Sequence, residues 1–328
     1  MAVLGAGSWG TALAIQLART GQPTTLWGRG TEHVDAMRID RRNLRYLPQA
    51  PFPDALRVES DLDAALAGAR DVLIAVPSHA FRELLERLQP RLEGPTRIAW
   101  ATKGFEIASG LLPHQVALQV LGERPTAVLS GPTFAGEVGA DLPTAMTVAS
   151  RDGVFGGELA ASLSGPNFRA YLQTDIVGVE VGGAVKNVIA IGAGISDGLG
   201  FGANTRVALI TRGLTEMTRL GIRLGAARET FMGLAGLGDL VLTCTDDQSR
   251  NRRFGIAIAR GNTLEHAAGT IGQVVEGVAA ARAVHKVAGR LDVEMPICEQ
   301  VYRIVHEGLD IRRAVDALMG RALRAEGD

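Results

Sequence analysis

The chain has few of the residues that mark a secreted or a metal-binding protein. Only two of its 328 residues are cysteine, which excludes a disulfide framework or a four-thiolate zinc site and is typical of a reducing compartment. The six histidines show no H-x-x-x-H or other ligand spacing, so we expect no metal. No G-x-S-x-G element is present, so serine hydrolase chemistry has no support.

Charge of one sign and long apolar runs are also lacking. A formal net charge of −1 gives no overall electrostatic reason to bind nucleic acid or an anionic membrane. No run of about 18 uncharged apolar residues occurs, and no basic leader precedes the first apolar residues. We therefore expect a soluble cytoplasmic protein without nucleic-acid or stable membrane binding, in which local cation clusters bind any anion.

The length and the order of patterns predict two domains. A chain of 328 residues exceeds what one hydrophobic core usually supports. Residues 1–176 alternate β-branched runs with amphipathic stretches, as in an α/β sheet with crossover helices. Residues 177–328 have almost only helical periodicity. The expected fold class is α/β, with an N-terminal Rossmann-type sheet domain and an all-helical C-terminal domain.

The periodicities and turn signals also place the individual elements. Expected strands are Ala2–Leu4, Thr24–Trp27, Val72–Val76, Arg97–Ala101, Ala127–Leu129, Ala145–Val148 and Phe168–Leu172. Expected helices of the first domain are Trp9–Arg19, Asp61–Ala67, His79–Leu88 and Pro113–Leu121. Those of the second are Val177–Ile195, Asn204–Leu220, Arg228–Leu234, Arg250–Ala259, Thr263–Thr270, Glu276–Ala288, Ile297–His306 and Ile311–Leu323.

A glycine fingerprint lies between the first strand and the first helix. Gly5, Gly7 and Gly10 form G-x-G-x-x-G in the context that a dinucleotide site needs. The first glycine permits a tight turn, the second lets a pyrophosphate approach the backbone, and the third allows close helix–sheet packing. Free N–H groups at the helix N-terminus complete the cradle. The alternative is a glycine turn without a ligand.

Arg29 bears on the choice of cofactor. It follows the second strand, where an acidic residue would bind the ribose hydroxyls of NAD. A guanidinium fits a 2′-phosphate and does not exclude a hydroxyl, so we favour NADP (as NADPH) with NAD tolerated. The alternative is a solvated loop arginine with Glu32 as a competing partner.

Lys186 is the one charge in an apolar, glycine-rich helical stretch. Burial would lower the pKa of its ammonium toward neutrality, as suits a group that exchanges a proton with a carbinol oxygen. The alternative is a lysine that reaches solvent from a surface helix. Dense glycines from Gly192 to Gly202 predict close approach by a ligand or by another backbone, with loose helix packing as the alternative.

Two further segments supply polar groups. Asp239 is a single carboxylate in an apolar loop, either a partner for a buried lysine or a helix N-cap. Residues 249–253, Ser-Arg-Asn-Arg-Arg, open a helix and have the composition of a phosphate site. A solvated basic face or a nucleic-acid patch is the alternative there, and the near-neutral charge and the lack of interleaved aromatic residues argue against nucleic acid. The segment Ser130–Ala135 follows a strand and either contacts ligand or forms a simple turn.

Taken together, these segments resemble the bacterial NAD(P)-dependent glycerol-3-phosphate dehydrogenase family over essentially the whole chain. The blocks that carry the resemblance are Gly5–Thr11, Ala101–Gly104, Ser130–Ala135, Gly182–Asn187, Ile191–Asn204, Gly236–Asn251 and Val274–Gly277. The resemblance implies interconversion of sn-glycerol 3-phosphate and dihydroxyacetone phosphate by hydride transfer, supplying glycerol 3-phosphate for phospholipid synthesis. One departure is the start of the first strand almost at residue 1, from which we expect weaker strand pairing.

The resemblance also implies roles for individual residues. Lys186 would be the general acid and base. Beside the glycines of the turn, the residues that would line the dinucleotide are Ser8, Trp9, Arg29, Lys103, Ala135, Arg250, Val274 and Glu276. Those that would contact the phosphorylated substrate are Lys103, Gly131, Thr133, Lys186, Asp239, Ser249, Arg250 and Asn251. Val274 and Glu276 rest on the resemblance alone.

Two other functions remain open from the sequence. One is another two-domain dehydrogenase of a hydroxy acid or sugar acid, which the phosphate cluster at residues 249–253 would distinguish. The other is a regulator that senses a dinucleotide without turnover, for which a buried lysine has no use. Apolar helical surface in the second domain also makes a homodimer an expectation.

Overall fold

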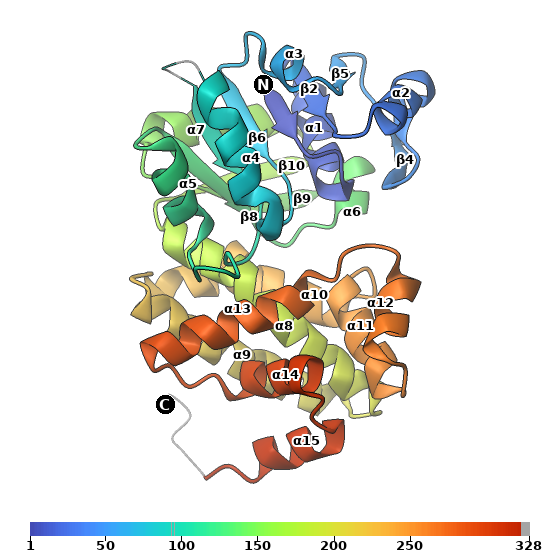
Figure 1. The fold of residues 1–328 in the computed structure, drawn as a ribbon, viewed down its shortest axis with the longest axis vertical. Coiled ribbons are helices and arrows are strands. Elements are labelled where there is room, and N and C mark those ends of the chain that lie inside the picture. The colour runs from blue at the N-terminus through green and yellow to red at the C-terminus, as the bar shows by residue number, and fades with distance from the viewer. Residues whose placement is uncertain (93, 95, 323–328) are drawn as a thin grey trace.

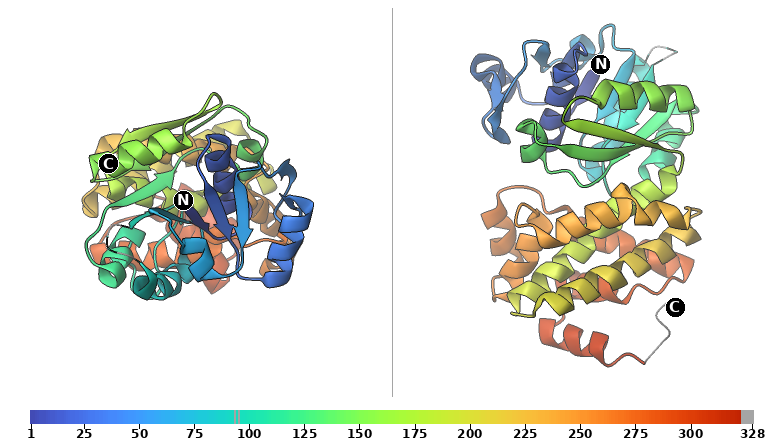
Figure 2. Two further views of the ribbon diagram at one scale, coloured as in Figure 1. Left: turned by 90° about the horizontal axis from the view of Figure 1, so that it is seen from above. Right: turned by 180° about the vertical axis from the view of Figure 1, so that it is seen from behind.

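The computed structural model describes residues 1–92, 94 and 96–322, which form a sheet domain stacked on a helical domain (Figures 1 and 2). The main sheet has the order β10-β9-β8-β7-β6-β1-β2-β5. Its neighbours are parallel except β8 and β9. Its strands are β1 (Ala2–Leu4), β2 (Thr24–Trp27), β5 (Leu56–Glu59), β6 (Asp71–Ile74), β7 (Arg97–Trp100), β8 (Thr126–Ser130), β9 (Thr144–Ala149) and β10 (Phe168–Gln173).

Helices cover both faces of this sheet. Side chains alternate along β1, so that Val3 joins the core on one face and Ala2 and Leu4 join the core on the other. One face packs against α1 (Ser8–Arg19), α6 (Ala135–Gly139) and α7 (Gly153–Leu163). The other packs against α3 (Leu62–Leu66), α4 (Phe81–Leu88) and α5 (Pro113–Leu121). This doubly wound arrangement confirms the expected Rossmann-type sheet.

All seven expected strands are present, and β1 is better paired than expected. It bonds to β2 on one side and to β6 on the other, which corrects the expectation of weak pairing. The sequence interpretation missed β5, the hairpin of β3 (Arg42–Asn43) with β4 (Leu47–Pro51), α2 (Thr31–Asp40), α6 and α7. Prolines interrupt β4, and α2 buries only Val34 and Met37, so neither segment has a clear period.

The helical domain is built around α8 (Ile176–Gly198), whose residues from Gly178 to Ser196 are all buried. By length and composition alone α8 could span a membrane, but 94% of its most apolar window is buried inside the protein. It is therefore a core helix. The surrounding elements are α9 (Ala203–Arg223), α10 (Asp239–Thr245), α11 (Arg250–Ala259), α12 (Leu264–Ile271), α13 (Glu276–Leu291), α14 (Pro296–Glu307) and α15 (Ile311–Met319).

Glycines of α8 and of α11 bring the backbones of these two helices close together. A Cβ at Gly194 would lie 2.0 Å from the carbonyl oxygen of Arg252, and one at Gly255 would lie 2.2 Å from that of Ile191. The glycine-rich stretch therefore serves tight packing of α8 on α11. The sequence left open whether a ligand or another backbone approaches these glycines, and in the structure it is the backbone of α11. The alternative of loose helix packing is wrong.

Two expected helices differ from the structure. Residues 228–234 hold only the short 3₁₀ helix η3 (Arg228–Met232), and a π-helical turn, η4 (Leu234–Gly238), leads into the unexpected α10. Glycines at 233, 236 and 238 prevent one regular helix there. The last helix, α15, ends at Met319, and the expected end at Leu323 lies outside the described residues.

Candidate active site

The glycine turn has the geometry of a phosphate cradle. Gly5 has a φ of 120°, and a Cβ there would lie 2.5 Å from the Ala75 carbonyl oxygen. A Cβ at Gly10 would lie 1.9 Å from the Gly5 carbonyl oxygen, so that residue is needed for the close turn. No described atom lies within 4 Å of a Cβ built at Gly7. The three glycines thus have the separate roles expected of them, and an open backbone faces the cavity beyond.

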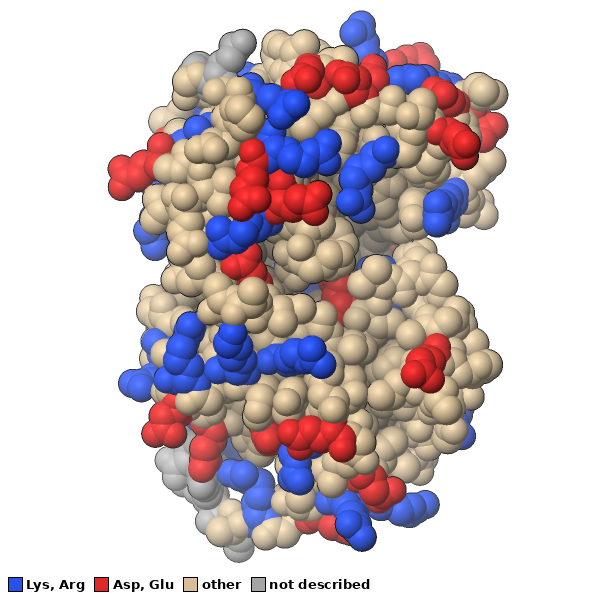
Figure 3. Space-filling view, in the orientation of Figure 1, with Lys and Arg blue, Asp and Glu red and all other residues tan. Residues whose placement is uncertain are grey.

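That hollow, which we call the glycine-turn cavity, has a volume of about 920 Å³ and lies between the two domains (Figure 3). Predicted cofactor residues that line it are Gly5, Gly7, Ser8, Trp9, Arg29, Lys103, Arg250, Val274 and Glu276. The indole nitrogen of Trp9 and Nε2 of His33 are buried beside it without a partner among the described residues. The cradle, the volume and these unpartnered ring nitrogens fit a dinucleotide.

Basic side chains gather at one end of the glycine-turn cavity. Arg29 lies exposed just after β2, and Arg45 and Arg87 also line the cavity. The guanidinium of Arg45 stacks over the ring of Tyr46, 5.1 Å from its centre. The sequence interpretation missed Arg45 and Tyr46 because it did not find the β3–β4 hairpin that carries them.

A second hollow, which we call the lysine cavity, has a volume of about 720 Å³ and shares Ser8, Trp9 and Lys103 with the first. It collects predicted residues from both domains: Lys103, Thr133, Ala135, Lys186, Asp239, Ser249, Arg250, Asn251 and Glu276. Tertiary folding thus joins segments that are far apart in the sequence. Ala135 lies here rather than in the glycine-turn cavity, and Gly10 is buried beneath the turn.

The centre of the lysine cavity is a carboxylate between two ammonium groups. Lys103 Nζ donates to Oδ2 of Asp239 over 2.8 Å, and Lys186 Nζ donates to Oδ1 of the same residue. Lys186 also donates to the Thr243 hydroxyl over 3.1 Å. The relative exposure of Lys186 is only 7%, so the alternative of a lysine reaching solvent is wrong.

Burial and charge set the protonation of this group. Burial lowers the pKa of Lys186 to about 8, the charge of Lys103 acts in the same direction, and Asp239 opposes both. Burial disfavours the ionised Asp239, but the ammonium groups of Lys103 and Lys186 outweigh it and hold the pKa of that carboxyl below its usual range. Asp239 therefore remains ionised while Lys186 titrates near neutral pH.

Asp239 is not the N-cap that the sequence offered as an alternative, and its helix carries a site residue, Thr243, that the sequence analysis missed. Asp239 is the first residue of α10, and Gly238 occupies the N-cap, so the carboxylate is not the helix cap. Thr243 follows four residues later, one turn along the same helix, where its hydroxyl contacts both Lys186 and the Asp239 carbonyl. The i, i+4 spacing of Asp239 and Thr243 could have indicated Thr243, but only if the sequence analysis had predicted a helix at α10.

The N-terminus of α11 lines the lysine cavity as expected, although its arginines differ in role. Ser249 is the N-cap and accepts from the backbone N–H of Arg252. The Arg252 side chain forms ion pairs with Asp197 and Asp247, which removes it from the set of phosphate ligands. Arg250 and Arg253 line the cavity, together with Ser249 and Asn251 at the start of the helix.

Asn251 and Glu276 belong to a polar network on the same wall. Asn251 donates to the side-chain oxygen of Asn187 over 2.9 Å and accepts from the Gly277 N–H over 2.8 Å. Asn187 donates in turn to Glu276 over 3.3 Å. Glu276 borders both cavities, whereas Val274 is 52% exposed and lines the glycine-turn cavity.

In the segment after β8, some residues line the lysine cavity and others only support the backbone turn. Thr133 and Ala135 line the lysine cavity, next to the start of α6. Gly131 is buried with a φ of 151°, and a Cβ there would lie 2.9 Å from Met146 Cα. Gly131 is not among the residues that line either cavity, and its visible role is in the backbone turn.

Comparison with known proteins identifies the same segments. Family models described as NAD-dependent glycerol-3-phosphate dehydrogenase match residues 1–155 for the N-terminus and residues 175–316 for the C-terminus. The glycerol-3-phosphate dehydrogenase [NAD(P)+] of Tolumonas auensis is 55% identical over 328 residues, which is 99% of this chain and 98% of that protein. That of Pseudoalteromonas translucida is 56% identical over 326 residues, covering 99% and 97%.

A solved structure agrees with these relatives. The crystal structure of glycerol-3-phosphate dehydrogenase from Coxiella burnetii matches with a TM-score of 0.95 at 52% identity, covering 98% of each chain. Both the order of the elements and the sequence blocks around the two cavities are therefore those of one family. The chain belongs to the NAD-dependent glycerol-3-phosphate dehydrogenase family.

Proposed function

We propose that the protein interconverts sn-glycerol 3-phosphate and dihydroxyacetone phosphate with NADP or NAD. The observation that carries this proposal is the Lys103–Asp239–Lys186 cluster, which lies in a cavity continuous with the glycine turn. The N-terminus of α11 borders the same cavity and suits a phosphate. A dinucleotide bound at the glycine turn would thus exchange hydride with a small molecule held by the proton carrier and the phosphate site.

Each cationic group in the lysine cavity has a proposed task. Bound NADPH supplies the hydride for reduction of the ketone. Lys186 donates a proton to the oxygen of that carbonyl, and takes it back from the alcohol in the reverse direction. Lys103 polarises substrate oxygens, and Asp239 orients both ammonium groups. Arg250, with Ser249 and the first turn of α11, holds the phosphate, beside Asn251 and Thr133.

The preference for NADP over NAD is proposed from the basic end of the glycine-turn cavity. Arg29, Arg45 and Arg87 all line this end, where a 2′-phosphate adds about two negative charges. No described carboxylate bonds to Arg29, and the nearby Glu59 forms an ion pair with Arg38. The dinucleotide wall would be completed by Trp9, Val274 and Glu276.

The other two functions are less well supported. A hydroxy-acid or sugar-acid dehydrogenase without a phosphate would not need the N-terminus of α11 beside the lysines. A non-catalytic dinucleotide sensor would not need to bury Lys186 against Asp239, at a substantial cost in solvation. Both alternatives therefore leave the most unusual part of the site unexplained.

The test is spectrophotometric. Purified protein is mixed with NADPH and dihydroxyacetone phosphate, and the loss of reduced-nicotinamide absorbance is followed, with a ketone lacking the phosphate as the matched control. We expect rapid oxidation only with the phosphorylated ketone. A folded sample that binds NADPH and consumes none would contradict the dehydrogenase, and equal rates for the two ketones would contradict the phosphate site.

We also propose a cytoplasmic location, without stable membrane association, and a role in supplying glycerol 3-phosphate for phospholipid synthesis. The near-neutral charge and the burial of α8 inside the protein support this location. The proposed domain junction lies between residues 176 and 177, since β10 ends at Gln173 and α8 begins at Ile176.

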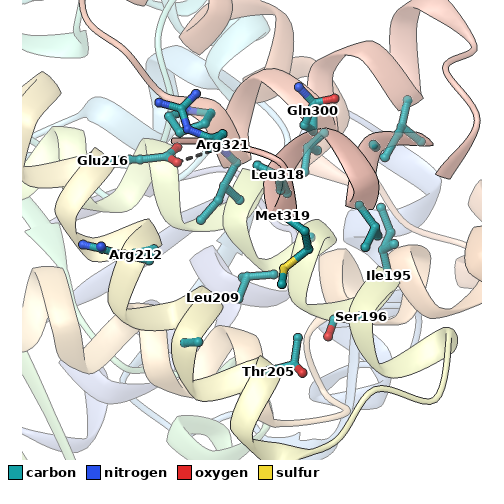
Figure 4. A pocket seen from close by; sticks show the side chains of 18 of the residues that line it. Ile195, Ser196, Thr205, Leu209, Arg212, Glu216, Gln300, Leu318, Met319 and Arg321 are labelled. Atoms are coloured by element: carbon teal, nitrogen blue, oxygen red, sulfur yellow. Dashed lines mark hydrogen bonds between the residues drawn. The ribbon is translucent and has the colours of Figure 1, made fainter. Parts of the chain in front are cut away.

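A homodimer through the far end of the helical domain is proposed from its apolar surface. An apolar pocket of about 440 Å³ lies between α15 and the body formed by α8, α9 and α14, with Leu209 and Leu318 in its walls (Figure 4). Val207 on α9 is 62% exposed and Met319 on α15 is 81% exposed. Val207→Glu should shift the mass measured by light scattering to that of a monomer. The matched control is Val154→Glu, since Val154 is 70% exposed on the sheet domain.

A further inference from the structure

A second buried carboxylate, Glu180, joins the two domains close to the lysine cavity. Glu180 lies on α8 with 4% relative exposure. Its Oε1 accepts from the Trp100 indole N–H and from the His114 backbone N–H, each over 2.9 Å. Its Oε2 lies 2.5 Å from Nδ1 of His114. Trp100 ends β7 and His114 lies in the first turn of α5, so one side chain of the helical domain holds two elements of the sheet domain.

The contact with Trp100 lies three residues before Lys103, which comes just after the end of β7, where Ala101 still donates to the Ile74 carbonyl. Along α8, the residues Glu180, Gly183 and Lys186 recur at intervals of three, so each is a neighbour of the next on the helix surface, in a row that turns by about 60° per step. A Cβ at Gly183 would lie 3.4 Å from Cγ of Lys103, so that the stem of this lysine crosses the helix there. At the next position Lys186 meets Asp239, which also binds Lys103.

The two segments have matching lengths. Three residues of extended chain from Trp100 to Lys103 span about 10 Å. Six residues of helix from Glu180 to Lys186 span about 9 Å. Fixing Trp100 against Glu180 therefore brings Lys103 level with Lys186, whereas a slip of one residue along the extended segment would move the ammonium by about 3.3 Å.

We propose that Glu180 is a positioning residue, which sets the register of the segment 100–103 on α8 and thereby places the Lys103 ammonium on Asp239. The inference rests on the functions proposed above for Lys103 and Lys186. Glu180 itself contacts neither cavity lysine, and it acts through Trp100.

Other contacts attach residues 108–109, which follow Lys103 in the chain, to the helical domain. Lys286 donates to the Ala108 carbonyl, and Arg290 donates to that of Ser109 over 3.2 Å. The attachment of residues 108–109 to α13 therefore does not depend on Glu180. Ala101 and Thr102 bond within the sheet domain, to the carbonyl oxygens of Ile74 and Val76, whereas Glu180 bonds Trp100 to α8.

The test compares Glu180→Ala and Glu180→Gln with a matched variant, Glu216→Ala. Glu216 is also a buried carboxylate, with 3% relative exposure, and accepts from the backbone N–H groups of Ile297 and Cys298. Within the described residues, Glu216 forms no hydrogen bond or ion pair with Lys103 or Trp100. Both alanine variants remove a buried acceptor of two N–H groups, so both should lower Tm, and only the first should disturb Lys103.

For Glu180→Ala we expect kcat for dihydroxyacetone phosphate reduction to fall at least about tenfold, because displacements near 1 Å have large effects on rate. NADPH affinity should change less than about twofold. The charge of Lys103 helps to lower the pKa of Lys186, so its displacement should raise the pH at which reduction declines. Glu180→Gln keeps an acceptor for both N–H groups and should retain most of kcat. Glu216→Ala should leave kcat and the pH midpoint unchanged.

A folded Glu180→Ala variant with wild-type kcat and pH midpoint would overturn the inference, as would equal losses in Glu180→Ala and Glu216→Ala. If Glu180→Ala does not fold, Trp100→Phe removes the indole N–H while keeping an aromatic ring, and we expect the same upward shift on a smaller scale. An unchanged profile in that variant overturns the inference too. Lys186→Ala, measured in parallel, distinguishes the failures: its full activity would contradict the proposed proton transfer whatever Glu180 does.

Discussion

Lys103 and Lys186 come from different domains and bind the two oxygens of one buried carboxylate, that of Asp239. One negative charge therefore faces two positive charges in a place with little solvent. With both lysines protonated the cluster has a formal charge of +1, which favours an anionic substrate. When Lys186 releases its proton the cluster is neutral, so proton transfer does not leave an uncompensated carboxylate.

Removal of the Lys186 amine should eliminate proton transfer. We expect Lys186→Ala to lower kcat for dihydroxyacetone phosphate reduction by about 10²- to 10⁴-fold. NADPH binding, measured by the change in nicotinamide fluorescence, should persist because the glycine turn is intact. A kcat within about threefold of wild type would show that another group carries the proton.

The rate should depend on pH in opposite ways in the two directions. Reduction needs the protonated amine, so its rate should fall as pH rises through about 8, the pKa to which burial lowers Lys186. Oxidation of glycerol 3-phosphate needs the free amine, so its rate should rise through the same value. Initial rates at saturating substrate in both directions give these two limbs, and two limbs that moved in the same direction would exclude Lys186 as the titrating group.

Asp239→Asn should move both limbs to lower pH. The carboxylate raises the pKa of Lys186 against burial, and an amide removes that charge. The variant also leaves two cations close together without a counter-charge, so we expect it to lose about 3–5 kcal/mol of stability. Urea unfolding measures this loss, and midpoints of both limbs at or above wild type would contradict the assigned role of Asp239.

Arg29→Asp should raise the KM for NADPH more than the KM for NADH. A carboxylate repels the 2′-phosphate and can accept from the ribose hydroxyls. Since Arg45 and Arg87 line the same end, we expect a selective effect of roughly tenfold. Arg57→Asp, on the exposed side of β5, is the control for added charge. Equal increases for the two cofactors would remove the argument from the 2′-phosphate.

Gly255→Ala should destabilise the helical domain. The added Cβ would lie 2.2 Å from the Ile191 carbonyl oxygen, and separation of α11 from α8 should cost about 1–3 kcal/mol. Gly289→Ala is the matched control, because Gly289 is exposed within α13 and its Cβ would meet no described atom within 4 Å. That variant should gain up to about 1 kcal/mol. Thermal unfolding compares the two, and equal Tm values would contradict the close packing.

Local patterns predict the regular part of the fold well. The seven expected strands are all present, and six of them are short apolar runs that are mostly buried on both faces of the sheet. The seventh, β10, is mostly exposed or half-buried at the edge of the sheet. Elements with weak periodicity were missed. The hairpin of β3 and β4 contains two prolines and few buried residues, and its cavity residues Arg45 and Tyr46 were missed with it.

The sequence by itself determined the glycine turn and the identity of its unusual lysine. A strand, three spaced glycines and a helix can form only a narrow range of backbone geometries. A charge within an apolar helix costs free energy unless it is paired, so such a residue is conspicuous in the sequence. The resemblance to a family added Val274 and Glu276, which no local pattern indicated.

Tertiary structure alone decided which groups meet. Nothing in the local sequence places Lys103 on the same carboxylate as Lys186, commits Arg252 to Asp197, or brings Trp100 onto Glu180. These contacts join segments that are separated by many residues and lie on different elements, so the packing of α8 against β7, α10 and α11 sets them. Local propensity acts over a few residues, whereas a buried charge is stabilised by whichever partner the folded chain brings to it.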